Sequence, residues 1–226
     1  MIALIETIVP NFSRASGALL QAIIQTLQMV FGSGIISFVI GTALGVALVV
    51  MRRGGILQNL VLYNVLDKAI NTIRSVPFLI LILLLFPLSR LIMGTSIGVA
   101  GAIVPLVFGT VPFFSRQIET AVSEVDRGLI EASAAMGFSP LQIIFRVYLR
   151  ESIPSIARVT QITAINLIHL VTLAGAVGAG GLGDFALRLG HQGNMRDLLW
   201  LAIAVILLLV TIIQTVGNIV IKKASH

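Results

Sequence analysis

Two short motifs and one polar pair contain the residues of this sequence that could do chemistry. Residues 94–98 read GTSIG, the GxSxG pattern that in soluble hydrolases exposes a nucleophilic serine, and His169 is a candidate base for Ser96. Residues 178–183 read GAGGLG, the GxGxxG pattern of dinucleotide-binding turns. Asn166 and His169 lie three residues apart within an apolar segment, a spacing that places them on one face of a helix.

The sequence around these motifs disfavours catalysis. A dinucleotide site needs a strand before GxGxxG, and here a long apolar segment precedes it. The serine motif lacks the spacing of rhomboid-type intramembrane proteases, and no aspartate lies close to His169, so an intramembrane protease is kept only as a rival interpretation. No GxxxxGK[ST] occurs, which excludes ATP binding through a P-loop of this chain. We therefore predict no catalytic residue and no metal site.

Two groups of residues are predicted to serve transport and packing. Asn166, His169 and Leu173 form the candidate lining of a translocation path, because polar groups inside a membrane are functional candidates by default. Helix–helix hydrogen bonding is the alternative role of the two polar residues. The glycines predicted to allow close packing or a hinge are Gly41 and Gly45, spaced GxxxG, together with Gly178, Gly180, Gly181 and Gly183.

The elements that must position these residues are membrane helices. Of 226 residues, 57% are hydrophobic and only 11% are charged, against about 25% in a soluble domain. The apolar runs are long and unbroken, which excludes the short alternating segments of a membrane barrel. The absence of cysteine excludes disulfides and thiolate chemistry, and the Lys and Arg residues are not clustered with aromatics as nucleic-acid binding requires. The composition predicts an all-α, multi-pass membrane protein.

We predict five transmembrane helices, each about 20 residues long, which suffices for the ~30 Å hydrocarbon core. An external lead-in covers residues 1–22, and no secretory signal is assigned because the first charge is Glu6. The transport domain covers residues 23–215, with a polar loop at 115–155, and residues 216–226 end the last span and form a short tail. The predicted spans are 29–51, 68–88, 91–114, 156–177 and 198–221.

The basic residues orient these spans. Four of the 15 Lys and Arg residues flank one side of the predicted membrane, namely Arg14, Arg90, Arg188 and Arg196. The other eleven flank the opposite side, which by the positive-inside rule is cytoplasmic. The N-terminus is then outside, and the C-terminus and the loop at 115–155 are cytoplasmic. The eleven are Arg52, Arg53, Lys68, Arg74, Arg116, Arg127, Arg146, Arg150, Arg158, Lys222 and Lys223.

The polar stretch 126–154 has the features of a docking element. Asp126 is a predicted N-cap, and Gly137 is a predicted left-handed C-terminal glycine, so that a helix of roughly two turns lies between them. A helix this short is not stable alone and must pack against something. Ser139 and Gln142 form a predicted capping box that starts a second, amphipathic helix. An ordinary interfacial loop is the alternative interpretation.

This stretch resembles the EAA loop of ABC importer permeases. Glu131-Ala132-Ser133, Gly137 after three intervening residues, and an apolar continuation to Ile153-Pro154 carry the resemblance. Residues 74–77, 94–98, 102–106 and 175–183 are similar to the five-span methionine permeases. Arg150 departs from the family, in which proline is common at this place. The resemblance implies a type I ABC importer permease fold. It implies a coupling helix whose ATPase-contacting residues are Glu131, Ala132, Ser133, Met136 and Gly137.

The resemblance also implies the chain's partners and substrate. The permease is expected to form a homodimer in the cell inner membrane, to dock a separate cytoplasmic ATPase that binds ATP and Mg²⁺, and to receive substrate from an external solute-binding lipoprotein. No cofactor of its own is expected. The implied substrate is methionine, L and also D. Another amino acid such as cystine is the alternative, and so is a secondary carrier, although the span cores lack the carboxylates that such carriers use for ion coupling.

Overall fold

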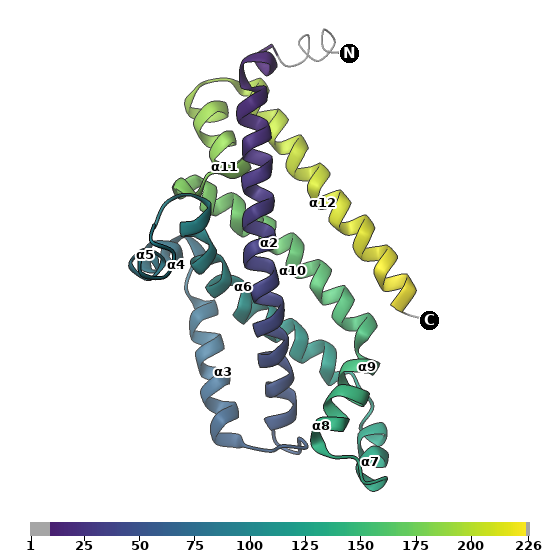
Figure 1. The fold of residues 1–226 in the computed structure, drawn as a ribbon. Coiled ribbons are helices and arrows are strands. Elements are labelled where there is room, and N and C mark those ends of the chain that lie inside the picture. The colour runs from purple at the N-terminus through teal and green to yellow at the C-terminus, as the bar shows by residue number, and fades with distance from the viewer. Residues whose placement is uncertain (1–9, 225–226) are drawn as a thin grey trace. The chain divides into compact units, whose positions relative to one another are not determined.

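The computed structural model describes residues 10–224, and regular structure in this part of the chain is helical throughout (Figure 1). Three of the segments, η1 to η3, are π-helical. The elements are α2 (Phe12–Met51), α3 (Leu60–Ser75), α4 (Phe78–Leu84), α5 (Phe86–Met93), α6 (Gly98–Ser123), α7 (Arg127–Ala135), α8 (Pro140–Ile143), η1 (Ile144–Tyr148), α9 (Leu149–Glu151), α10 (Ile153–Ala174), η2 (Gly175–Ala179), α11 (Gly181–Phe185), η3 (Ala186–Gln192) and α12 (Arg196–Ala224).

The all-helical prediction is confirmed, but the prediction of five spans is wrong. Within residues 10–224, four helical stretches are long and apolar enough to cross a membrane. They correspond to the predicted first, third, fourth and fifth spans, with different ends. The four are Phe12–Met51, Gly98–Ser123, Ile153–Ala179 and Arg196–Ala224.

The predicted second span, 68–88, fails because Pro77 interrupts it. Proline disfavours helical geometry in the preceding residue, and Val76 is accordingly extended (φ −82°, ψ 123°). The first part of the segment belongs to amphipathic α3, and the rest is divided between α4 and α5, which meet at Leu85. The third span is shifted toward the C-terminus: Gly94 ends α5 in a left-handed conformation, α6 begins only at Gly98, and it continues to Ser123.

The predicted ends of the chain also differ from the structure. Residues 1–9 of the predicted lead-in and residues 225–226 of the predicted tail lie outside the described residues. From Phe12 onward the predicted lead-in is already part of α2. Asn11, just before α2, bonds to Asp197 at the start of α12 through its backbone N–H (2.9 Å) and its side-chain amide (3.1 Å).

The chain divides into two compact units. Within the described residues, unit 1 contains 10–35, Pro77–Gly109 and Ala164–Ile213, and unit 2 contains Ile36–Val76, Thr110–Thr163 and 214–224. The chain changes unit at five points: four lie inside α2, α6, α10 and α12, and the other is the Val76–Pro77 break. The eleven basic residues predicted for the cytoplasmic side all belong to unit 2, and the other four belong to unit 1.

Unit 1 has two apolar cores. One joins α2, α4, α6 and α10 through buried Met29, Ile82, Leu106 and Val171. The other joins the first turns of α2 to α11 and to the start of α12, and its buried residues are Ala15, Leu19, Ala22, Leu182, Phe185, Leu198 and Ala202.

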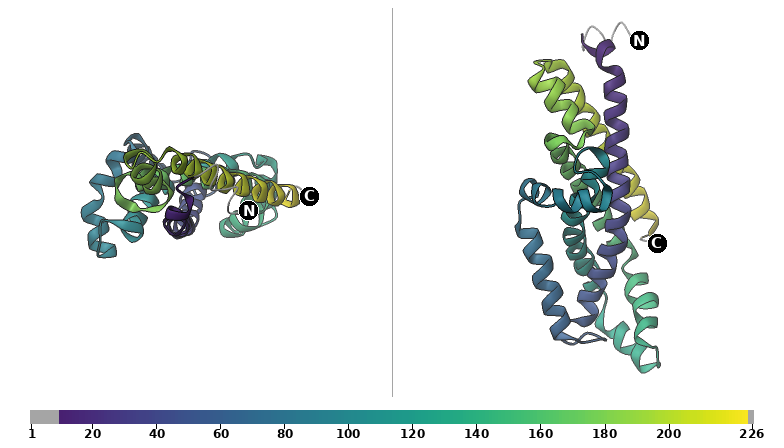
Figure 2. Two further views of the ribbon diagram at one scale, coloured as in Figure 1. Left: turned by 90° about the horizontal axis from the view of Figure 1, so that it is seen from above. Right: turned by 60° about the vertical axis from the view of Figure 1, so that its left-hand side comes forward.

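Unit 2 has one core, in which α2 packs closely against α6. A Cβ atom added at Gly41 would lie 2.7 Å from Cδ1 of Phe114, and one at Gly45 would lie 2.6 Å from Cβ of Ile118. The GxxxG pair therefore lies where the two backbones approach most closely, as small residues allow. Figure 2 shows α3 beside the C-terminal part of α2, joined to it by the loop after Met51.

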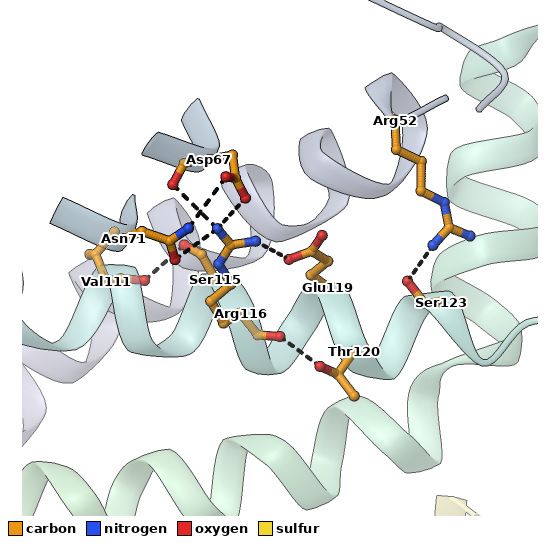
Figure 3. A network of polar contacts seen from close by, with 9 residues as sticks. All are labelled: Arg52, Asp67, Asn71, Val111, Ser115, Arg116, Glu119, Thr120 and Ser123. Carbon is orange, nitrogen blue, oxygen red and sulfur yellow. Dashed lines mark hydrogen bonds and ion pairs between the residues drawn. The ribbon is translucent and has the colours of Figure 1, made fainter. Parts of the chain in front are cut away.

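A polar network in unit 2 attaches α3 to α6 (Figure 3). The guanidinium of Arg116 on α6 forms ion pairs with Asp67 on α3 and with Glu119 one turn further on (2.7 Å). It also donates a hydrogen bond to the side-chain oxygen of Asn71 (3.1 Å). Mutual pairing lowers the cost of withdrawing these charges from water. Polar residues of α3, Asp67 and Asn71, thus fix it to α6.

Candidate functional site

The helix α7 occupies the place of the predicted docking helix, and its N-terminus is capped as predicted. Oδ1 of Asp126 accepts hydrogen bonds from the backbone N–H groups of Gly128 (2.7 Å) and Leu129 (3.3 Å). These are two of the donors that the first turn of a helix leaves without a partner, and a carboxylate there also complements the helix dipole. The local sequence therefore determines where α7 begins.

The C-terminus of α7 is a Schellman motif. Gly137 has φ +83°, its N–H donates to the carbonyl of Ala134 (3.0 Å), and the N–H of Phe138 donates to the carbonyl of Ser133 (3.1 Å). Only a residue that tolerates the left-handed region ends a helix this way at low cost. The prediction for Gly137 is confirmed, and α7 is limited to nine residues.

The return from α7 begins at a capping box, also as predicted. The hydroxyl oxygen of Ser139 accepts from the N–H of Gln142 (3.4 Å), and the side-chain oxygen of Gln142 accepts from the N–H of Ser139 (2.8 Å). The following segment is α8, η1 and α9 in succession. Arg150, which replaces the proline common in the family, lies within α9 and is exposed. The turn at Ser152 then leads into α10.

Four of the five predicted coupling residues are exposed on α7 and its C-terminal turn. Glu131, Ala132, Met136 and Gly137 face solvent, and Met136 is 68% exposed. Ser133 is buried instead, and its hydroxyl donates to the carbonyl of Leu129 (2.7 Å). Nearby apolar side chains are also exposed: Leu129, Leu141 and Phe145. A short helix with one carboxylate among exposed apolar groups is suited to binding a protein surface.

Glu131 also lines a cavity of about 90 Å³ between α7 and the end of α2. Arg52, Arg127 and Tyr148 line the same cavity, and Arg52 donates a hydrogen bond to Ser123 (3.0 Å). Burial raises the pKa of the Tyr148 phenol, while the positive charges of Arg52 and Arg127 act in the opposite direction. The carboxylate of Glu131 is therefore in a locally basic setting.

The predicted path residues lie together on α10. Asn166 is half-buried, while His169 and Leu173 are exposed. Neither polar side chain has a hydrogen bond within residues 10–224, so the alternative role in helix–helix bonding is not seen within one copy of the chain. Gln161, by contrast, attaches α10 to α12 through the carbonyl of Gln214 (2.9 Å) and the side chain of Asn218 (3.3 Å).

The predicted packing glycines after α10 form a compact turn. Gly178, Gly180 and Gly181 all have positive φ, at +96°, +82° and +77°. Gly183 approaches the backbone so closely that an added Cβ would lie 2.0 Å from the carbonyl oxygen of Thr172. The turn follows helices α10 and η2, not the strand that a dinucleotide site requires.

The GxSxG motif is likewise a turn between two helices. Gly94 ends α5, Gly98 begins α6, and the hydroxyl of Thr95 bonds to the backbone of Ile97. A hydrolase nucleophile would follow a strand. Among the described residues, no cluster of His, Cys, Asp and Glu side chains could hold a metal ion.

Two sets of polar contacts were missed by the sequence interpretation. One is the Arg116 network, whose residues were counted only as flanking charges. The other joins α2 to α11: Gln25 accepts from the N–H of Gly181 (2.8 Å), and Thr26 accepts from the N–H of Leu182 (2.9 Å). The sequence assigned no role to Gln25 or Thr26, because no local pattern pairs residues 156 positions apart.

Comparison with known proteins agrees with this geometry. Residues 40–225 match the family model "Binding-protein-dependent transport system inner membrane component". The chain is 42% identical over 221 residues to the probable D-methionine transport system permease protein MetI of Vibrio cholerae, covering 98% of both proteins. The D-methionine transport system permease protein MetI of Salmonella typhimurium is 47% identical over 138 residues, which cover 61% of this chain and 64% of that protein.

Solved structures give the same result. "Inward facing conformations of the MetNI methionine ABC transporter" superposes with a TM-score of 0.92 at 39% identity, covering 94% of this chain and 99% of that chain. An amino acid ABC transporter crystallised with histidines has a TM-score of 0.78 at 16% identity, which shows a shared fold. The chain is thus a multi-pass inner-membrane permease, and it belongs to the family of binding-protein-dependent transport system inner membrane components, in which it resembles the methionine-type ABC importers.

Proposed function

We propose that this chain is the permease subunit of an ATP-driven importer of methionine, taking the D and the L enantiomer. The single observation that carries the coupling mechanism is α7, a nine-residue helix capped at both ends and exposed along the face that includes Glu131 and Met136. The family match and the names of the similar permeases support the rest. The chain itself binds neither ATP nor Mg²⁺ in this proposal, and both belong to a partner ATPase subunit.

The charge distribution supports an orientation in the membrane. Unit 2 contains eleven of the 15 Lys and Arg residues, together with α7 and the last turns of α12. By the positive-inside rule, the basic flanks of unit 2, including the end of α12, lie on the cytoplasmic side. Because α7 belongs to the same unit, it is then accessible to a cytoplasmic ATPase.

Transport follows from two alternating states of an assembly. Two copies of the chain pair, two ATPase subunits dock on the two α7 helices, and a solute-binding lipoprotein delivers substrate to unit 1. ATP binding brings the ATPases together and moves both α7 helices, so that the path opens outward. Work is transmitted because the ATPase makes different contacts with α7 in the two states.

The residues proposed to line the path are Asn166, His169 and Leu173. They occupy one face of α10, and His169 and Leu173 are exposed in a single copy of the chain. A second copy placed against this face would enclose them. The polar pair then offers hydrogen bonds to the charged groups of an amino acid, and Leu173 provides an apolar constriction.

Coupling is tested by Glu131→Arg. We expect methionine uptake in cells to fall by about tenfold or more, because a reversed charge opposes an electrostatically complementary partner. Ser13→Arg, which adds an arginine at an exposed position of unit 1, serves as the control and should leave uptake unchanged. Wild-type uptake by the Glu131→Arg variant, together with no ABC ATPase co-purifying from native membranes, would sink the proposal.

The alternatives are separated by the energy source and by competition. Uptake that survives ATP depletion but is lost with the proton gradient would indicate a secondary carrier. Unlabelled cystine that competes with labelled methionine more strongly than either methionine enantiomer would assign another amino acid as substrate.

A further inference from the structure

A second cavity, lined by other residues of the α7 region than the Glu131 cavity, is acidic. It has a volume of about 340 Å³ and lies between the end of α6, the first turn of α7 and the α9–α10 junction, all within unit 2. No Lys or Arg lines it. The lining residues that matter here are Glu124, Asp126, Leu129, Glu151, Ser152 and Ser155.

The three carboxylates of this cavity have no cationic partner within residues 10–224. Asp126 uses Oδ1 as the N-cap of α7, and Glu124 accepts a hydrogen bond from Ser155 (2.6 Å). Glu151 is exposed and has neither a hydrogen bond nor an ion pair in this part of the chain. Like charges gathered on one cavity repel each other unless a cation lies among them.

This cavity differs from the surroundings of the other acidic residues of unit 2. Asp67 and Glu119 are paired with Arg116, and Glu131 lies in the cavity lined by Arg52 and Arg127. The three carboxylates of the acidic cavity are exposed and share their cavity with no Lys or Arg, although unit 2 has an excess of basic residues. A complementary positive charge for this cavity would therefore come from a partner.

Ser152 provides an independent sign of a missing ligand. This residue is 2% exposed, it contributes to the cavity lining, and its hydroxyl oxygen has no hydrogen-bond partner in the described structure. A buried polar group without a partner is costly, and a hydroxyl oxygen can accept a hydrogen bond from a cationic N–H donor. A cation in the cavity would satisfy Ser152 and the carboxylates together.

The chemistry favours an organic cation over a metal ion. No cluster of His, Cys, Asp and Glu among the described residues is arranged to hold a metal. A guanidinium or ammonium group needs only several acceptors spread over the wall of a cavity this large. Two wall residues lie at the start of α7, Asp126 as its N-cap and Leu129 in its first turn, so a protein bound to α7 would reach the cavity entrance.

We propose that the acidic cavity receives a Lys or Arg side chain of the ATPase subunit that docks on α7. The cation would lie among Glu124, Asp126 and Glu151 and donate a hydrogen bond to Ser152. This inference rests on the proposed function, since it assumes that the ATPase binds α7. In this proposal two charged sites adjoin α7: the cavity in which Glu131 lies beside Arg52 and Arg127, and the acidic cavity.

The test measures the affinity of the permease, held in lipid nanodiscs, for the ABC ATPase that co-purifies with it, at low and at physiological salt. The variants are Glu151→Gln alone, and Glu124→Gln, Asp126→Asn and Glu151→Gln combined. Asparagine at Asp126 keeps the N-cap acceptor. We expect the combined variant to bind about tenfold more weakly at low salt and to lose much of the salt dependence, since charge complementarity is what it removes. Glu151→Gln should show a smaller change in the same direction.

The controls distinguish the two levels of the proposal. Asp184→Asn, which neutralises a carboxylate of unit 1, should bind the ATPase as wild type does. Wild-type affinity and salt dependence in both cavity variants, while Glu131→Arg still abolishes binding, would overturn the cavity proposal and leave the proposed function standing. Absence of binding by the wild-type permease would overturn both. Stabilisation of the isolated permease by MgCl₂ that requires Glu151 would assign the cavity to a metal ion and also overturn the proposal.

Discussion

Two short helices of this permease, α7 and α11, each have a glycine of positive φ at one end, but they obtain their N-terminal caps from different places. The N-terminal N–H groups of α7 bond to Asp126, one residue before the helix. Those of α11 bond to Gln25 and Thr26 on α2, 156 residues away in the sequence. Most of α7 is exposed, whereas Gly181, Leu182, Gly183 and Phe185 of α11 are buried.

The difference shows that the source of a helix cap separates a helix that is free to bind a partner from one that is part of the core. A helix capped by its own neighbours needs no other element to define its ends, so its surface remains available to a partner. A helix capped by a distant element is part of the packing of that element. Changes at α11 should therefore unfold unit 1, and changes at α7 should affect partner binding while the rest of the chain remains folded.

The largest effect is expected for Gly183→Ala. The new Cβ would lie 2.0 Å from the carbonyl oxygen of Thr172, and this contact is with backbone, which cannot rotate away. We expect a loss of about 3 kcal/mol or more in the free energy of unfolding, at the upper end of overpacking costs, or no folded protein. Thermal unfolding of the purified permease measures it.

Gly17→Ala is the matched control for Gly183→Ala. Gly17 lies within α2 in unit 1 and has open space where the Cβ would be placed. Alanine there should stabilise the protein by roughly 0.5–1 kcal/mol through helix propensity. Equal melting temperatures for the two variants would contradict the close approach at Gly183.

A smaller effect is expected for Thr26→Val, which removes one of the two non-local capping hydrogen bonds of α11 while keeping the side-chain shape. Thr26 is 1% exposed, so the N–H of Leu182 would be left without a partner in a buried place. The cost should be about 1–3 kcal/mol, again in thermal unfolding. Thr120→Val removes only a hydrogen bond to a carbonyl of its own helix at an exposed site, and it should change stability by less than about 0.5 kcal/mol. Equal costs for the two variants would show that α11 does not depend on α2.

The smallest effect on global stability is expected for Gly137→Ala at the end of α7. The φ of +83° is strained for alanine, by about 1–2 kcal/mol, although no atom lies within 4 Å of the new Cβ. Because α7 is locally determined, hydrogen exchange should accelerate only in the amides of 127–138, while the melting temperature stays near that of wild type and methionine uptake falls. Gly137→Asn should recover part of the protection, since asparagine tolerates this conformation. A global loss of stability would contradict this expectation, because it would show that the rest of the fold depends on α7 as it does on α11.

The same distinction explains what could be predicted from the sequence. The caps at Asp126, Gly137 and Ser139 are local, and all three were predicted correctly. The helical membrane class, the inner-membrane location and the methionine-type resemblance depend on composition and motifs, and they are confirmed as well.

The predictions that failed concern contacts between residues distant in the sequence, or segments in which local signals compete. Arg116 was counted only as a flanking charge and Asp67 was given no partner, because nothing in a one-dimensional pattern pairs residues 49 positions apart. The apolar residues of 68–88 suggested a span, but Pro77 interrupts the helix there. Gln25 and Thr26 were assigned no role, and the one they have becomes visible only when α11 lies against them.

The length of α2 has a consequence for how the permease is held in lipid. A helix of 40 residues is about 60 Å long, roughly twice the thickness of the hydrocarbon core. Even when tilted, such a helix is longer than the hydrocarbon core is thick, so part of it extends beyond the core. An apolar helix longer than the hydrocarbon core is accommodated by tilting, kinking or local thickening of the bilayer, so this part of the transporter should respond to membrane thickness.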